Sequence, residues 1–172
     1  MSVPEQKFVS TLRQGAVYFA PTRVGSPNYH FCIVMNENPT ADDLVLLEII
    51  SSQVEKTKRR VTLQQHYACS AVALDQAMIA FLHKPSVVDC NSCLECSKGL
   101  FTQDLKEPRA SYAGQIPQDI LEKLITETMA STGVRPEQKR RINKARAELI
   151  EKRKADLEKG IVPPTTITIK VS

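Results

Sequence analysis

The sequence of 172 residues contains no tryptophan, and aromatic side chains make up only 5% of it. Because the bases of single-stranded nucleic acid stack on aromatic rings, we expect no large stacking platform in this chain. No window approaches the roughly 18 uninterrupted apolar residues of a membrane-spanning helix. The beginning of the chain, MSVPEQKFVSTLRQG, also lacks an apolar run of signal-peptide length. These absences predict a soluble, cytoplasmic protein with no membrane partner.

Disulfide bonds are not expected either, because the five cysteines are an odd number scattered along the chain. Three of them, Cys90, Cys93 and Cys96, form a C-x2-C-x2-C run that is typical of metal sites. Zinc takes four ligands, however, and a fourth would have to come from Cys69, His66 or His83. An iron–sulfur cluster normally shows a fourth cysteine at motif spacing, often followed by proline. We therefore predict no metal and no cofactor, and we interpret the three cysteines as small apolar core residues; a metal-stabilised interaction module is the alternative.

The overall composition is that of an ordinary globular protein, with 42% apolar and 24% charged residues. The length suits one compact domain, or one domain with an appendage. Charge is uneven: residues 135–159 hold ten Lys/Arg and five Asp/Glu, a net of +5 against +4 for the whole chain. An anionic partner would therefore meet this C-terminal stretch first.

Short runs with the composition of β-strands fill the first half of the chain. They are GAVYFAP (15–21), YHFCIVMN (29–36), LVLLEIISS (44–52), ACSAVALD (68–75) and PSVVDCN (85–91). The third run is almost continuously apolar, which predicts a strand buried on both faces. The polar stretch QVEKTKRRV (53–61) between the third and fourth runs is interpreted as a loop or hairpin arm. Closely spaced strands of this kind predict a small barrel or a strongly curled sheet over residues 13–92.

The second half changes to helical spacing. IPQDILEKLITETMA predicts a helix over residues 116–131, and a second helix is expected from Pro136 to Gly160. TTITIKV (165–171) alternates like a short terminal strand. We therefore predict an α+β protein, with a barrel domain over residues 1–112 and a helical extension with a terminal strand over residues 113–172.

Three segments in this order carry a family resemblance: QGAVYFAP (14–21), HFCIVMNENP (30–39) and VLLEIISSQ (45–53). Together they resemble the MazF/PemK-type toxins of bacterial toxin–antitoxin pairs, over roughly residues 13–90. The resemblance implies a small SH3-like barrel, usually a homodimer, whose partners are an antitoxin and RNA. It also implies metal-independent cleavage of single-stranded RNA, in which the 2′-hydroxyl of the RNA is the nucleophile.

In the family, an arginine near the start of the second strand and a Thr or Ser at the end of the third carry the chemistry. The hydroxyl position falls on Ser51 or Ser52 of this sequence. The arginine position is occupied by His30, and Arg23 lies in the preceding loop. The resemblance therefore implies a catalytic set of His30, Ser51, Ser52 and Arg23.

The missing arginine leaves two interpretations open. Because imidazole titrates near neutral pH, His30 suits proton transfer during RNA cleavage, and Arg23 would supply the positive charge. Alternatively the catalytic site has been lost, and the barrel is a binding module for protein or nucleic acid that acts through its basic C-terminal helix. In that case His30 would be a structural residue hydrogen-bonded to backbone, and the two serines would only begin a turn.

Two basic segments are candidate nucleic-acid contacts. In EKTKRR (55–60), phosphate groups would meet Lys56, Lys58, Arg59 and Arg60. In the second predicted helix, Lys139, Arg140 and Arg141 form a similar cluster. The alternative for both segments is an ordinary solvated surface.

Overall fold

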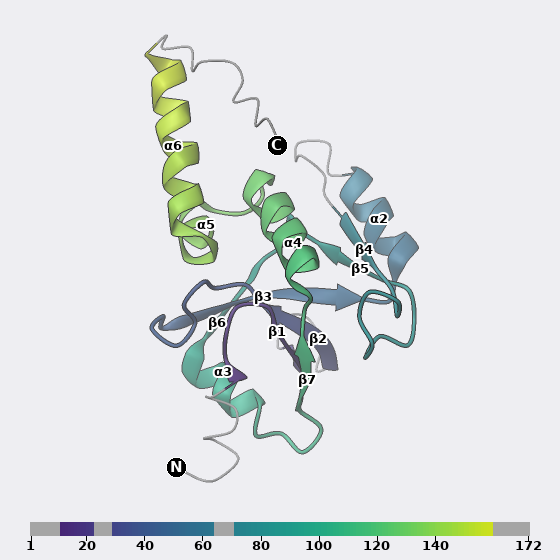
Figure 1. The fold of residues 1–172 in the computed structure, drawn as a ribbon. Helices are drawn as coiled ribbons and strands as arrows, with labels where there is room; N and C mark the ends of the chain where they lie inside the picture. Colours follow the sequence, from purple (N-terminus) through teal and green to yellow (C-terminus); the bar gives the residue numbers. More distant parts are fainter. Residues whose placement is uncertain (1–10, 23–28, 64–70, 160–172) are drawn as a thin grey trace, which may run out of the picture.

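Seven antiparallel strands form one sheet in the computed structural model, which describes residues 11–22, 29–63 and 71–159 (Figure 1). The strands are β1 (Ala16–Pro21), β2 (Tyr29–Val34), β3 (Leu44–Ser51), β4 (Ala71–Leu74), β5 (Ser86–Asp89), β6 (Leu94–Ser97) and β7 (Ser111–Gln115). Their order across the sheet is β4-β5-β3-β2-β1-β7, and β6 pairs with β3. The described strands thus form an open, curled sheet with β4 and β7 at the ends of the order.

Strand β3 is the centre of this sheet. One of its edges pairs with β2, in a register that sets Phe31 opposite Ile50. Its other edge is shared by two strands, because Leu44–Leu47 pair with β6 whereas Ile50 and Ser51 pair with β5. This shared edge explains the length of β3, eight residues, which is greater than that of any other described strand.

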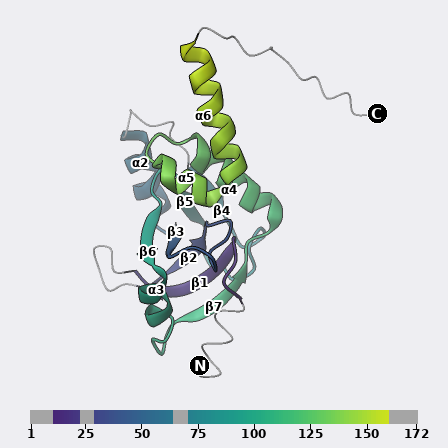
Figure 2. The same cartoon turned by 90° about the vertical axis from the view of Figure 1, so that its left-hand side faces the viewer.

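Both faces of the sheet are covered. Alternate residues of a strand point to opposite faces, so Val17, Ile33 and Leu46 belong to one apolar core and their neighbours to another. Helix α4 (Gln118–Ala130) covers the first face, and helix α3 (Lys98–Asp104) covers the second (Figures 1 and 2). The prediction that residues 44–52 form a strand buried on both faces is confirmed by the burial of β3.

Three further helices complete the described fold: α2 (Val54–Leu63), α5 (Pro136–Ile142) and α6 (Lys144–Glu158). The single helix expected after Pro136 is thus divided in two, because Asn143 adopts an extended conformation. Its side-chain oxygen accepts a hydrogen bond from the backbone N–H of Arg146 and so caps α6. Beyond its first turns α6 projects away from the rest of the protein (Figures 1 and 2). None of the helices in the described ranges is long and apolar enough to cross a bilayer.

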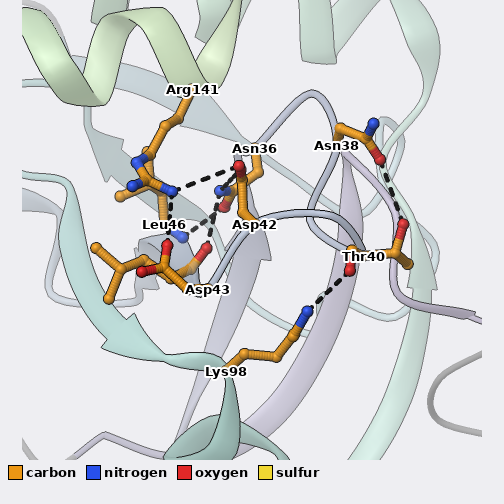
Figure 3. Close-up of polar contacts among 9 residues, drawn as sticks. Asn36, Asn38, Thr40, Asp42, Asp43, Leu46, Lys98 and Arg141 are labelled. Carbon is orange, nitrogen blue, oxygen red and sulfur yellow. Dashed lines mark hydrogen bonds and ion pairs between the residues drawn. The ribbon is translucent and has the colours of Figure 1, made fainter.

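The turn between β2 and β3 anchors α5 (Figure 3). Arg141 forms ion pairs with Asp42 at 3.4 Å and with Asp43 at 3.0 Å. The Asn36 amide donates to Asp42, and its oxygen accepts from the backbone N–H of Leu46, which holds the turn in register. This polar network therefore joins α5 to the turn between β2 and β3.

Several elements differ from the sequence-based expectation. Residues 53–61, expected as a loop or hairpin arm, form most of α2, because Thr57 and Val61 lie one turn apart and bury one side of a helix. Leu94–Ser97, for which no strand was predicted, form β6, since the edge of β3 offers unpaired backbone groups there. Strand β7 pairs with β1 and extends across residue 112, where the sequence analysis placed a domain boundary. The division of the chain into two domains stays a prediction. The expected terminal strand, 165–171, lies outside the described residues.

One carboxyl group is buried in the middle of β3. The Glu48 side chain is fully buried, and one of its oxygens accepts a hydrogen bond from the Thr128 hydroxyl of α4. Its other oxygen has no hydrogen-bond partner in the described structure. Burial raises the pKa of Glu48 to about 8, and the negative charge of Asp89 acts in the same direction.

This carboxyl makes stability depend on pH. Because the pKa of Glu48 is raised, the folded chain keeps a proton that the unfolded chain releases, so the free energy of unfolding falls between about pH 4.5 and pH 8. We predict that Glu48→Gln removes this fall and raises Tm at pH 9, by about 2–4 °C for each kcal/mol gained. Thermal melts from pH 5 to pH 9 test this, with the exposed Glu107→Gln as control. Parallel Tm profiles for wild type and Glu48→Gln would contradict it.

Candidate functional site

The end of β3 meets β2 and the start of α2 at one corner of the sheet. His30 and Ser51 each lie one residue beyond the paired residues Phe31 and Ile50, so the register places them opposite each other. Both line a pocket of about 690 Å³, together with residues from α2, β5 and β6. The remaining lining residues are Ile49, Gln53, Lys56, Thr57, Arg59, Arg60, Leu63, Asp89, Ser92 and Leu94. Two of the predicted catalytic residues are therefore brought together; Arg23 lies outside the described residues.

The basic wall of this pocket is one face of α2. Lys56, Arg59, Arg60 and Leu63 follow the i, i+3, i+4, i+7 spacing that aligns side chains on one side of a helix. Lys58 is not among the lining residues, and its ammonium lies 3.9 Å from the Glu55 carboxylate on the solvent side. Three of the four cations predicted in this segment therefore face the pocket. Helical spacing alone groups Lys56, Arg59 and Arg60 on one side of α2, and the packing of α2 turns that side to the pocket.

Ser51 has a structural task as well as a place in the pocket. Its Oγ accepts a hydrogen bond of 3.1 Å from the backbone N–H of Gln53, which stabilises the turn from β3 into α2. The Thr57 hydroxyl lies 3.5 Å from the same oxygen. These contacts occupy acceptor positions of Oγ and leave its proton available to a ligand. Ser52 is exposed and lines the neighbouring pocket instead.

The cations of α2 differ in their partners. The Arg60 guanidinium lies 2.8 Å from the carboxylate of Asp89, which is buried and also accepts two hydrogen bonds from Asn91. Asp89 thus fixes Arg60 in the pocket wall. Lys56 and Arg59 are exposed and form no ion pair within the described ranges. The pocket accordingly has a net positive charge, and the half-buried imidazole of His30 makes no hydrogen bond to the described part of the chain.

A second pocket, of about 420 Å³, adjoins the first. The two pockets share His30, Ser51 and Gln53 as lining residues. The second pocket is otherwise lined by Phe19, Tyr29, Phe31, Ile50, Ser52, Leu82, His83, Lys84 and Ser86. It differs from the first in having three aromatic rings in its lining, those of Phe19, Tyr29 and Phe31, and a single cation, Lys84.

The other predicted nucleic-acid contacts lie elsewhere. Lys139 and Arg140 line a separate pocket of about 190 Å³ between α5 and α6. Lys154 of α6 lines it as well, and burial together with the Lys154 charge lowers the pKa of Lys139. Arg141 is held by Asp42 and Asp43. The cluster 139–141 therefore does not present three equivalent cations on one surface.

The three cysteines of the C-x2-C-x2-C run are divided between the two faces of the sheet. Cys90 is buried in the core under α4 and Cys93 packs against that core, whereas Cys96 packs on the core under α3. Burial raises the pKa of both Cys90 and Cys93, which keeps these thiols protonated. Within the described ranges, no three His, Cys, Asp or Glu side chains are arranged to hold a metal ion.

Comparisons with known proteins find similarity at the level of solved structures. No protein-family model matches the chain, and no curated protein matches it. Among solved structures, the chain is similar to a chain in the crystal structure of MazE–MazF (Form-III) from Deinococcus radiodurans. The identity is 15%, the TM-score is 0.43, and the match covers 69% of this chain and 92% of the other. A TM-score of this size establishes neither a shared activity nor a shared partner.

We predict that Ser51→Ala destabilises the protein by about 1 kcal/mol, because the Gln53 amide loses its acceptor. A change of that size lowers Tm by about 2–4 °C. Ser52→Ala is the matched control, since Ser52 is exposed and its hydroxyl makes no hydrogen bond to the described residues. Differential scanning calorimetry of both variants checks the difference; equal Tm values would show that the Ser51 hydroxyl does not stabilise the turn.

Proposed function

We propose that this protein is a metal-independent endoribonuclease that cleaves single-stranded RNA, and the toxin component of a toxin–antitoxin pair. The observation that carries the proposal is the convergence of His30, Ser51 and the basic face of α2 on one pocket. These residues come from two segments of the chain, β2 and the consecutive elements β3 and α2. The resemblance of residues 13–90 to MazF/PemK-type toxins supports the same activity.

The proposed reaction is a transesterification within the RNA. His30 takes the proton of the 2′-hydroxyl, and the resulting oxygen attacks the adjacent phosphorus. The bond from phosphorus to the 5′-oxygen breaks, and that oxygen takes the proton back from the protonated His30, through a water molecule, as the next nucleotide leaves. The products are a 2′,3′-cyclic phosphate and a 5′-hydroxyl. The Ser51 hydroxyl donates a hydrogen bond to a phosphate oxygen as negative charge develops.

The positive charge of the pocket supports binding and the transition state. Lys56 and Arg59 have no anionic partner in the described chain, so a phosphate group can pair with them without displacing another contact. Arg60 is already paired with Asp89, so it contributes mainly to the shape of the pocket wall and to the positive electrostatic potential of the pocket. Arg23, which lies outside the described residues, is proposed as a further cation beside His30.

The fold and assembly expected of such a toxin are part of the proposal. We infer that the open sheet described above corresponds to an SH3-like barrel of MazF/PemK type, and that the protein is a homodimer whose activity an antitoxin inhibits. A cytoplasmic location follows from an RNA substrate and an antitoxin made in the same cell.

A second candidate is a catalytically silent protein that binds nucleic acid or a partner protein through its C-terminal helices. The projection of α6 favours it (Figure 2), since this helix is mostly exposed and includes Leu149, a large apolar residue that is 49% exposed. Lys152→Glu combined with Arg153→Glu reverses two exposed charges of α6 without touching the sheet. Loss of RNA binding in this variant, with no cleavage by wild type, would support the second candidate.

We predict that wild-type protein cuts a long unstructured RNA in the presence of EDTA into discrete fragments with 2′,3′-cyclic phosphate ends. His30→Ala should lower the cleavage rate at least about a hundredfold, as expected for loss of a general base. Lys58→Ala is the control, because this side chain does not line the pocket. Absence of fragments under all conditions, with a melting curve typical of folded protein, would refute the enzymatic proposal.

We also predict that Lys56→Ala and Arg59→Ala reduce the salt dependence of RNA binding. Each lost phosphate contact should change the slope of log K against log [salt] by about 0.7 for a single strand. Lys58→Ala should leave the slope unchanged, since its partner is Glu55. The test is to measure the binding constant of an uncleavable 2′-O-methyl RNA at salt concentrations from about 50 to about 300 mM. Equal slopes for all three variants would place the RNA elsewhere.

A further inference from the structure

Four aromatic rings form a continuous row at the edge of the sheet, beside the candidate site. The Phe19 ring lies 5.4 Å from that of Tyr29 and 5.1 Å from that of Phe31. The Phe31 ring lies 5.2 Å from that of Phe81. The distances are between ring centroids and fall in the range of direct aromatic contact. We call these four residues the aromatic row.

The aromatic row is only partly covered by the protein. All four rings are half-buried, and Phe19, Tyr29 and Phe31 line the pocket of about 420 Å³. The outer end is held by Arg109, whose guanidinium lies 4.9 Å from the centre of the Tyr29 ring. A volume of this size lies within the range of about 300–1,000 Å³ that is typical of small-molecule pockets.

The aromatic pocket is continuous with the basic one. His30, Ser51 and Gln53 separate the two and line both. A ligand that reaches from one pocket to the other therefore passes directly over the His30 imidazole and the Ser51 hydroxyl. It must carry negative charge at one end and a flat apolar group at the other.

We propose that the aromatic pocket binds one unpaired base of the RNA, the base next to the phosphate held by Lys56 and Arg59. This inference rests on the proposed function and specifies how its substrate is recognised. A single strand has the required alternation of phosphate and flat base, whereas in a duplex the bases are already stacked on one another. Stacking on a ring supplies affinity for any base.

The rim of the aromatic pocket has the groups needed to hold the rest of the nucleotide. Ser52 and Gln53 are exposed polar side chains in its lining, and they can bond to the donors and acceptors on the edge of a base. Lys84 also lines this pocket, is exposed and forms no ion pair within the described ranges. It therefore suits the phosphate on the far side of the bound base.

The test uses short 2′-O-methyl RNA, which binds but cannot be cut because its nucleophile is blocked. In a first set of strands, a single fluorescent base, 2-aminopurine, is placed at each position in turn. A further strand then carries an abasic nucleotide at the position where the fluorescence changes most. We expect quenching at one position, and roughly tenfold weaker binding of the abasic strand. Equal affinities for the abasic and the intact strand would overturn the proposal.

Two variants locate the stacked base. Phe19→Leu keeps an apolar side chain but removes a ring, so binding of the intact strand should weaken roughly tenfold while binding of the abasic strand stays unchanged. Tyr112→Leu is the matched control, because it removes a half-buried ring that contacts Tyr18 on the opposite face. A Phe19→Leu protein that loses affinity equally for both strands would contradict base stacking.

The outcomes separate this inference from the proposed function. Position-specific quenching without any cleavage of ordinary RNA would refute the nuclease and leave the base pocket in place. Cleavage with no effect of the abasic nucleotide would refute the base pocket alone. Conversion of a dimer to a monomer by Phe19→Leu in sedimentation, with unchanged RNA affinity, would assign the aromatic row to a protein interface and overturn the inference.

Discussion

The hydrogen bonding of β3 to three other strands is the constraint on which the rest of the structure depends. Because β6 and β5 share one edge of β3, the chain must leave the sheet after Asp89 and return at Leu94. On the other edge of β3, pairing with β2 sets His30 opposite Ser51. A shift of β2 by one residue in this register would turn the His30 side chain to the other face and separate it from Ser51.

The site follows from what happens where β3 ends. Ser51 is both the last residue of the strand and the acceptor that stabilises the turn into α2. Helix α2 then runs beside β5, with Thr57 and Val61 buried and its basic face turned to the pocket. A single corner of the sheet thus presents a basic surface on one side of His30 and Ser51 and an aromatic surface on the other.

Chemically reactive groups elsewhere in the fold are used for packing. Cys90 and Cys93 lie beneath α4, near the Glu48 carboxyl, whose charge also raises the pKa of both thiols. Glu48 itself is buried between β3 and α4 and shares a hydrogen bond with Thr128. Burial keeps all three groups protonated near neutral pH, so the exposed corner at His30 has the more suitable chemistry for a reaction.

The sequence by itself determined the mixed α+β class, most of the strands and the helix α4, because their apolar spacing reflects local geometry. It also predicted His30, Ser51 and the basic segment after them as candidate site residues. Only the tertiary structure decided which cations face the pocket, since this depends on which side of α2 packs on the sheet. Composition argued against an aromatic platform, yet four of the nine rings meet in one row. Residues as distant as Phe19 and Phe81 become neighbours through strand pairing and packing of the loop after β4 against the sheet, which no local pattern encodes.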